Sequence, residues 1–202
     1  LTVKSAPGGS VGQVARSIVT GPNRRVYTHY AAKPMQVFDI DANSRSVTNQ
    51  TVKDGQYWNG NAASVDGTIV YVSTVRGTVY RVKYTSNSLE YVGQFGTYGS
   101  GFLQFCLACN RDGSKIYGIP SSGADEDKLY EIDAATGTCT MLFDFKSVGL
   151  SGEWTGFNAR DQLGNIYFSR HQYHSGPPSL VQITVEKPQT VRVTAQDLAN
   201  KR

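Results

Sequence analysis

Leucine and methionine, on which helical bundles depend most, are scarce in this chain of 202 residues. The sequence contains 10 Leu and 2 Met, against 20 Val, 8 Ile and 17 Thr. β-Branched residues, together with the 12 Tyr, suit the pleated surface of a half-buried strand and are poorer helix formers. The composition therefore excludes an all-α protein and favours β-structure.

Long apolar runs and a strong excess of one charge are absent too. No apolar run approaches the roughly 18 residues that span a bilayer, so we expect no membrane span. The net charge is only +4, and adjacent basic residues occur only at Arg24-Arg25 and Lys201-Arg202. Because no basic stripe with interleaved aromatic residues appears, we expect no nucleic-acid partner. The chain starts at Leu1 with no signal-peptide pattern, so a signal peptide was either removed or never present, and a secreted or cell-surface location is slightly favoured.

What the sequence does contain is a fourfold repeat. Each unit has a turn with Gly or Asn, a strand with an aliphatic residue and Tyr, and a strand with alternating apolar and polar residues. The matched residues are Tyr27, Tyr71, Tyr117 and Tyr167, which lie 44, 46 and 50 residues apart. Self-similarity at this period is typical of the blades of a β-propeller.

Each unit is predicted to be a four-stranded antiparallel meander. The expected innermost strands are 14–19, 61–65, 105–109 and 155–160, and the outermost are 46–52, 89–95, 138–145 and 190–194. A β-sandwich or barrel also has short strands at this spacing, but the same strand type recurring at the same position disfavours it. We therefore predict an all-β fold, a β-propeller built of four-stranded antiparallel blades.

The predicted blades cover approximately 13–52, 60–95, 104–145 and 154–194, and residues 1–4 form a stray outer strand. They make up one β-propeller domain or a propeller segment. Either the stray strand closes the ring by pairing with the last blade, or the chain is part of a larger propeller. The second alternative is favoured, since most propellers with this repeat length have more than four blades.

The third unit carries a resemblance to known families. Its turns read Asp112-Gly113-Ser114-Lys115-Ile116-Tyr117 and Ile132-Asp133-Ala134-Ala135-Thr136-Gly137. They are similar to the "DGxxIY" and "IDxxTG" turns of the YVTN, NHL and quinoprotein-like propellers, in which glycine serves the positive φ angles of tight hairpins. The resemblance implies the architecture but not the chemistry, because these families include lyases, lactonases, dehydrogenases and plain binding scaffolds.

Cysteine is rare, and its placement predicts free thiols. Cys106 and Cys109 lie in one predicted strand, where residues three apart point to opposite faces, so joint metal binding is not expected. Cys139 lies three strands away in the same blade, at roughly 14 Å, whereas a disulfide permits a Cα separation of about 7 Å. We predict three free, mostly buried thiols.

Two aromatic loops mark a candidate binding face. The connections into an innermost strand, and those between the second and third strands, emerge on one face of a propeller, which we call the loop face. Two of them carry the only Trp residues, each near amide side chains that suit stacking on a sugar or clamping a peptide. Packing of each Trp between adjacent blades is the favoured interpretation for the Trp side chains themselves, and direct ligand contact is the alternative. The candidate ligand-binding residues here are Trp58, Asn59, Asn61, Glu153, Trp154 and Asn158.

The three histidines are expected on the same face. His29 and His171 end the second strands of the first and fourth units, and His174 follows three residues on. They are candidate ligand-binding residues that in principle suit a three-imidazole metal site, with Glu153 approaching from a neighbouring loop. Solvated loop histidines are the favoured interpretation, and we expect no metal and no cofactor. The acidic loop 124–127 is another place for a cation, but such runs usually face water.

These observations lead to a functional hypothesis with two alternatives. We expect a non-catalytic, lectin-like binding module that recognises a carbohydrate or protein partner through the loop face. The first alternative, implied by the resemblance, is a lyase- or lactonase-like enzyme that uses His171, His174 and Glu153. The second is a structural subunit that associates with another chain to complete a larger propeller.

Overall fold

The computed structural model describes residues 17–22, 25–29, 36–42, 44–47, 58–86, 88–97, 107–120, 122–150, 158–161, 165–170, 179–184 and 190–192. These residues form sixteen β-strands and one short 3₁₀ helix, η2 (Phe145–Val148). Within these ranges, no helix has the length and apolar character needed to cross a membrane.

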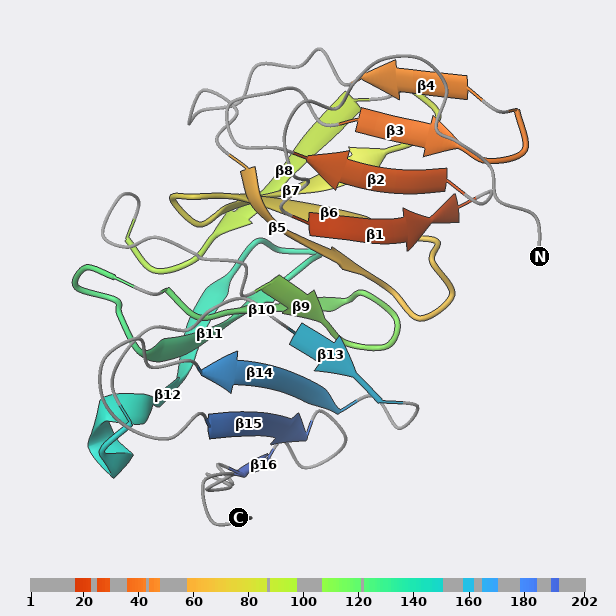
Figure 1. Cartoon of the computed structure of the whole chain (residues 1–202). Coiled ribbons are helices and arrows are strands. Elements are labelled where there is room, and N and C mark those ends of the chain that lie inside the picture. Colours follow the sequence, from red (N-terminus) through yellow and green to blue (C-terminus); the bar gives the residue numbers. More distant parts are fainter. Residues whose placement is uncertain are drawn as a thin grey trace.

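The strands form four antiparallel sheets, each made of four strands that are consecutive in the chain (Figure 1). We call them blades 1 to 4. Blade 1 comprises β1 (Ser17–Gly21), β2 (Arg25–His29), β3 (Gln36–Asp39) and β4 (Ser44–Val47). Blade 2 comprises β5 (Trp58–Ala63), β6 (Val70–Thr74), β7 (Thr78–Lys83) and β8 (Ser88–Gln94). Blade 3 comprises β9 (Leu107–Cys109), β10 (Lys115–Gly118), β11 (Lys128–Asp133) and β12 (Cys139–Asp144), and blade 4 comprises β13 (Asn158–Arg160), β14 (Ile166–Arg170), β15 (Ser179–Thr184) and β16 (Thr190–Arg192).

The blades follow one another in an arc, as in a β-propeller, which confirms the predicted fold. The innermost strand β5 packs beside β1 on one side and β9 on the other, and β9 contacts β13 in turn. Blade 1 (orange) and blade 4 (blue) lie at opposite ends of the arc (Figure 1). Among the described strands, no contact of comparable extent joins these two terminal blades. The free edges of the innermost strands form what we call the inner edge of the arc.

The matched tyrosines hold the same register position in every blade. Each lies opposite the innermost strand, in the pairs Val19–Tyr27, Ala62–Tyr71, Ala108–Tyr117 and Ala159–Tyr167. The repeat read from the sequence is therefore a structural repeat. This register also defines which positions of different blades are equivalent.

Tyr71 fastens blade 2 to blade 3. Its ring is fully buried, and its hydroxyl donates a hydrogen bond of 2.6 Å to the carbonyl oxygen of Gly113, in the first turn of blade 3. Gly113 has φ +73°, and a Cβ placed there would lie 3.3 Å from the Ile69 side chain of blade 2. Glycine thus serves both the left-handed turn and the close approach of the preceding blade. Burial raises the pKa of Tyr71 to about 12, so the phenol stays neutral and donates this bond.

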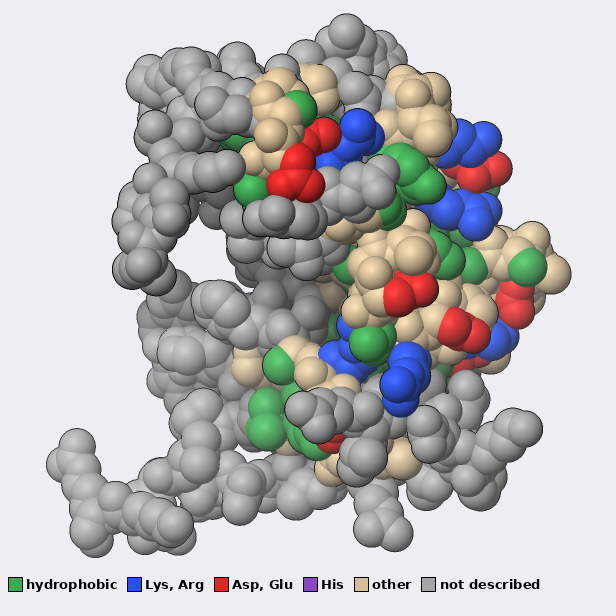
Figure 2. Space-filling view, turned by 90° about the vertical axis from the view of Figure 1, so that its right-hand side faces the viewer, with side chains coloured by type: hydrophobic (Ala, Val, Ile, Leu, Met, Phe, Trp, Pro, Cys, Tyr) green, Lys and Arg blue, Asp and Glu red, His purple; other side chains and the backbone are tan. Residues whose placement is uncertain are grey.

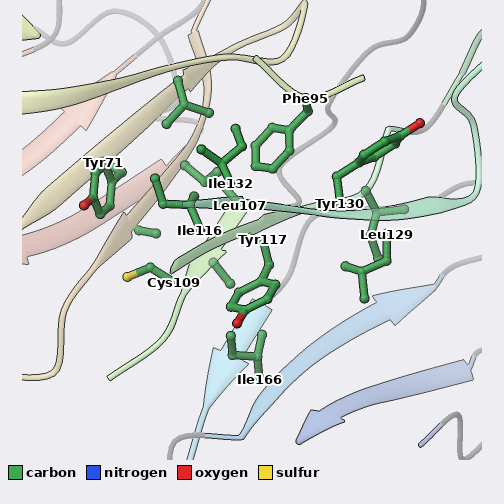
Figure 3. Packing of buried hydrophobic residues seen from close by; sticks show 14 of the residues in the cluster. Tyr71, Phe95, Leu107, Cys109, Ile116, Tyr117, Leu129, Tyr130, Ile132 and Ile166 are labelled. Atoms are coloured by element: carbon green, nitrogen blue, oxygen red, sulfur yellow. The ribbon is translucent and has the colours of Figure 1, made fainter. Parts of the chain in front are cut away.

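One hydrophobic core joins blades 2, 3 and 4 (Figure 3). Its largest fully buried side chains include Tyr71, Tyr117 and Phe168. Figure 3 shows Tyr117 reaching from blade 3 toward Ile166 of blade 4. Tyr71 contacts blade 3 in a comparable way, through its hydrogen bond to Gly113. A second core, which contains Val37, Val70 and Val72, lies between blades 1 and 2.

Gly137, in the "IDxxTG" turn, also serves the packing between blades. It has φ +73°, and a Cβ there would lie 2.5 Å from the carbonyl oxygen of Val92 in blade 2. Asp133 begins the turn and accepts bonds from the backbone N–H groups of Ala135 and Thr136. These bonds, after the stronger effect of Lys115, lower the pKa of Asp133 to about 2. Both turn motifs therefore have a structural role.

The strand boundaries differ from the predicted ones mainly in blades 1 and 2. Strand β5 begins at Trp58 rather than at residue 61, because a β-bulge between Trp58 and Gly60 accommodates one extra residue, Asn59. Strand β4 covers Ser44–Val47, earlier than the predicted 46–52. The predicted stray strand 1–4 lies outside the described residues.

Candidate functional site

The structure describes some of the predicted site residues fully, some in part and some not at all. Trp58 and Asn59 lie in β5, His29 ends β2 and Asn158 begins β13, but only their backbone is described. Asn61 is the one whose side chain is described as well. The remaining predicted site residues, which lie outside the described ranges, are Glu153, Trp154, His171 and His174.

Asn61 lies in the innermost strand β5 and faces blade 1. It is paired with Val72, which packs against Val37 of blade 1, so this side of the sheet is turned toward that blade. The residue is only 7% exposed. Within the part of the chain that the structure describes, neither the Nδ2 nor the Oδ1 atom of Asn61 has a hydrogen-bond partner. Each such buried group costs about 1–3 kcal/mol, which a packed core normally avoids.

The position in blade 3 that is equivalent to Asn61 is occupied by an apolar residue, Leu107, which packs against the preceding blade. Leu107 precedes Ala108 just as Asn61 precedes Ala62, and its side chain is fully buried. A Cβ at Gly60 of blade 2 would lie 2.9 Å from the Cβ of Leu107, which places Leu107 tightly against the preceding blade. Blade 2 thus carries an unpaired amide where blade 3 carries leucine.

Asn158 occupies the same register position in blade 4. It precedes Ala159, which lies opposite Tyr167, as Asn61 precedes Ala62 opposite Tyr71. The two loops matched in the sequence therefore deliver asparagine to equivalent positions on alternate blades. This equivalence holds although the segment from Trp154 to Asn158 is one residue longer than that from Trp58 to Asn61.

Arg160 is a residue of the inner edge that the sequence analysis did not select. Its Nη1 atom donates to three carbonyl oxygens, those of Ala63 at 3.0 Å, Asn110 at 3.2 Å and Cys109 at 3.4 Å. These carbonyls belong to blades 2 and 3, so one guanidinium ties three blades together. In the sequence Arg160 looks like an ordinary residue before a turn, and its distinctive position is evident only from the register with Tyr167.

The described cysteines are free, as predicted. Cys109 is buried in β9, and Cys139 is partly buried in β12, three strands away in the same sheet. Burial raises the pKa of Cys109 to about 11, an effect that outweighs the opposing influence of Arg160. Cys109 is therefore a protonated thiol at neutral pH. Cys106 lies outside the described residues.

Two of the three acidic side chains in loop 124–127 are buried, so the expectation that this loop faces water is wrong for Asp125 and Asp127. Asp125 is 8% exposed and Asp127 is fully buried. Asp125 accepts bonds from the Thr97 backbone N–H at 2.9 Å and from the Tyr130 hydroxyl at 2.7 Å. Thr97 follows blade 2, so this carboxylate fixes the connection between blades 2 and 3. The sequence shows the charges but not the partners that bury them.

Charges on the described surface are mixed. On the face shown in Figure 2, the described basic and acidic side chains alternate without gathering into a patch of one sign. Most described basic groups pair with carboxylates, as Arg25 does with Asp39 at 3.3 Å and Lys115 with Asp133 at 2.8 Å. In the described ranges, no group of three or more His, Cys, Asp or Glu residues is arranged to hold a metal ion.

Comparisons with known proteins agree on the class of fold. No protein-family model matches the sequence, and no curated protein matches it significantly. A solved structure of a Bacteroides thetaiotaomicron protein of unknown function has a TM-score of 0.63 and 18% identity, covering 90% of this chain and 44% of that one. Hydrazine synthase of Kuenenia stuttgartiensis has a TM-score of 0.61 and 13% identity, covering 90% of this chain and 50% of that one.

A third similar structure is the tricorn protease, with a TM-score of 0.52 and 8% identity, covering 95% of this chain and 21% of that chain. Hydrazine synthase and the tricorn protease both contain propeller folds. This chain spans half or less of each of the three structures. At these identities the likeness establishes a propeller-like architecture and no activity.

Proposed function

We propose that this chain is a non-catalytic binding module that recognises a carbohydrate or protein partner where β5 meets the loop face. The observation that carries the proposal is the buried, unpaired amide of Asn61. The amide offers two donors and an acceptor to hydroxyl or peptide groups of a ligand. An unpaired buried amide lowers the free energy of unfolding, and proteins retain such groups chiefly at functional sites.

The residues that precede Asn61 support a ligand that enters from the loop face. Trp58 and Asn59 lie in the same strand, and the rise of about 3.3 Å per residue places Trp58 roughly 10 Å from Asn61. A disaccharide or a short peptide segment has this length. An aromatic residue at the entrance and an amide further in is an arrangement suited to stacking followed by directional hydrogen bonds.

Replacing Asn61 by leucine, the residue of the equivalent position in blade 3, separates a ligand-binding role from a structural one. We expect N61L to leave the free energy of unfolding unchanged or to raise it by about 1–2 kcal/mol, because the unpaired amide disappears. Binding on glycan and peptide arrays should be lost. Urea unfolding and array binding measure the two effects.

Asn110 provides the matched control for this experiment. Its Nδ2 atom donates to Ser114 and its Oδ1 atom accepts from the Lys115 backbone N–H, so its amide is fully used. N110L should therefore destabilise the protein while binding persists. The proposal fails if N61L destabilises as N110L does, or if N61L binds every wild-type ligand with unchanged affinity.

The enzyme alternative rests on His171, His174 and Glu153, which lie outside the described residues, and it remains a prediction. The alternative of a larger propeller is favoured by a specific observation on blade 4. In blades 2 and 3 the face turned to the next blade is buried, with Val79 and Leu129 fully covered. Leu180 holds the equivalent position in blade 4, because it lies two residues before Gln182, which is paired with Tyr167. Its side chain is 41% exposed.

The tyrosines of the repeat are also less buried in blade 4 than in blades 2 and 3. Tyr71 and Tyr117 are 0% and 1% exposed, whereas Tyr167 is only partly buried. The Tyr167 hydroxyl donates to Asp161 of its own blade at 2.9 Å, while that of Tyr71 reaches the next blade. Blade 4 thus presents the residues by which an inner blade docks onto its successor.

The second candidate function is therefore assembly of a larger propeller with a second copy of this chain, blade 4 of each copy against blade 1 of the other. The side of blade 1 turned away from blade 2 carries Val26 and Phe38, opposite the side on which Val37 contacts blade 2. Two such contacts related by a twofold axis close a ring without leaving an open face.

We expect the wild-type chain to sediment as a dimer at about 50 μM, a concentration at which interfaces of ordinary size are populated. L180E should sediment as a monomer, because a charge opposes the docking of an apolar blade face. V148E provides the control, since Val148 is 54% exposed on η2, which packs beside β11 of blade 3. A monomeric wild type, or equal association of L180E and V148E, would reject this candidate.

A further inference from the structure

Arg160 holds an unusual position among the described basic side chains. The partly buried ones, Arg25, Arg81, Lys115 and Lys128, each form an ion pair with a carboxylate. Arg160 is partly buried as well, but no described carboxylate pairs with it. Its equivalents in blades 2 and 3 are Ala63 and Cys109, so a long cationic side chain is peculiar to blade 4.

The three carbonyls fix the guanidinium without neutralising it. All three bonds to carbonyl oxygens come from Nη1, at 3.0, 3.2 and 3.4 Å, and the guanidinium also interacts with the side chain of Cys109. No described carbonyl oxygen is bound to Nη2 or Nε, which offer further donors. A carbonyl dipole orients a guanidinium but carries no net charge. Cys109, the nearest titratable group named in these contacts, does not supply the missing negative charge, because burial keeps its thiol protonated at neutral pH.

Arg160 also lies close to the candidate binding residue Asn61. Its Nη1 atom contacts the carbonyl of Ala63, which is two residues beyond Asn61 in β5. At a rise of about 3.3 Å per residue, the two positions are roughly 7 Å apart along the strand. The guanidinium is therefore anchored at the inner edge of the arc two residues along β5 from Asn61, whose side chain lies on the side of β5 that faces blade 1.

We propose that Arg160 binds the carboxylate of an acidic sugar whose hydroxyl groups bind Asn61. The planar fork formed by Nη2 and Nε matches the two oxygens of a carboxylate, and a preoriented fork loses little side-chain entropy on binding. A uronic-acid unit carries a carboxylate and vicinal hydroxyls on one ring, as this pair of residues requires. This inference rests on the proposed function and narrows its ligand to acidic carbohydrate.

The test compares an oligosaccharide that ends in glucuronic acid with its carboxyl-reduced, glucose-terminated form, by isothermal titration calorimetry. We expect the acidic form to bind at least about tenfold more tightly, which is the usual scale of a charge-assisted pair. The preference should weaken as salt is raised from 50 to 500 mM, because screening opposes it. An acidic tetrapeptide serves as the peptide probe and should not bind.

R160K keeps the positive charge for the three carbonyls but lacks the forked donor, so the fold should survive while the acid preference falls to about threefold or less. R111M is the control, because Arg111 is an exposed basic residue of the neighbouring turn. It should behave as wild type, and thermal unfolding verifies that all three proteins are folded.

The outcomes distinguish this inference from the function on which it rests. If both oligosaccharides bind equally and N61L abolishes both, the binding function stands and the acidic preference is wrong. If R160K retains the full preference, Arg160 is not the carboxylate partner. If the tetrapeptide binds and the sugars do not, the ligand is a protein and the inference is overturned. If no probe binds, both proposals fail for carbohydrate.

Discussion

Replacing Tyr71 by alanine is expected to lower the free energy of unfolding by about 4 kcal/mol, the usual cost of deleting a fully buried aromatic side chain. The ring fills the space between blades 2 and 3, and its hydroxyl satisfies the Gly113 carbonyl at 2.6 Å. The variant therefore loses packing and leaves a buried acceptor unpaired. Denaturant unfolding, monitored by circular dichroism, measures the effect.

The exposed Tyr91 gives the matched control for this substitution. It lies in β8 of the same blade and is 60% exposed, so Y91A should cost less than about 1 kcal/mol. Y71F should cost about 1–2 kcal/mol, because only the hydrogen bond is removed. Equal losses in Y71A and Y91A would contradict the role of the repeat tyrosine in docking one blade onto the next.

The second large effect is expected at Asp125. D125A should destabilise the protein by about 3–4 kcal/mol, because bonds to a buried carboxylate contribute about 1.5–3 kcal/mol each and their donors would be left unpaired. The named donors are the Thr97 backbone N–H and the Tyr130 hydroxyl. Hydrogen exchange at the Thr97 amide should accelerate as well, since this bond holds the connection between blades 2 and 3.

An exposed aspartate in a turn provides the control, because its substitution removes only hydrogen bonds within that turn. Asp112 accepts bonds from the backbone N–H and hydroxyl of Ser114, and it is exposed. D112A should cost about 1 kcal/mol and leave the exchange of the Thr97 amide unchanged. If D125A costs no more than D112A, the acidic loop is a solvated surface feature after all.

Most of the architecture could be predicted from the sequence because short sequence patterns determine the strands and turns of each blade. The tyrosine of each second strand, together with its Gly-containing turn, recurs once per blade, and strand alternation fixes which side faces the neighbour. The repeat predicts third strands at 35–41, 78–83, 128–133 and 179–184, and the last three match the observed bounds for this reason. Asn61 was selected in the sequence because it lies three residues after one of the two Trp residues, and its role in binding stays a prediction.

The features that were missed depend on contacts between distant segments. The bulge at Asn59 shifts the start of β5 by three residues, and no local signal distinguishes it from a loop. Asp125 is buried by Thr97, 28 residues away, and Arg160 binds Ala63, 97 residues away. Such partners are brought together only by the packing of whole blades, which hydrophobic periodicity does not specify.

The side-chain amide of Asn61 gives the most direct test of the central claim. In ¹⁵N–¹H correlation spectra, the Nδ2 resonances of Asn61, assigned through N61L, should shift in proportion to occupancy when a binding oligosaccharide is added. The Nδ2 resonances of Asn110, whose amide is already paired, should stay in place. If the protein becomes saturated with ligand while the Asn61 resonances do not move, the binding site lies elsewhere and the account of β5 is wrong.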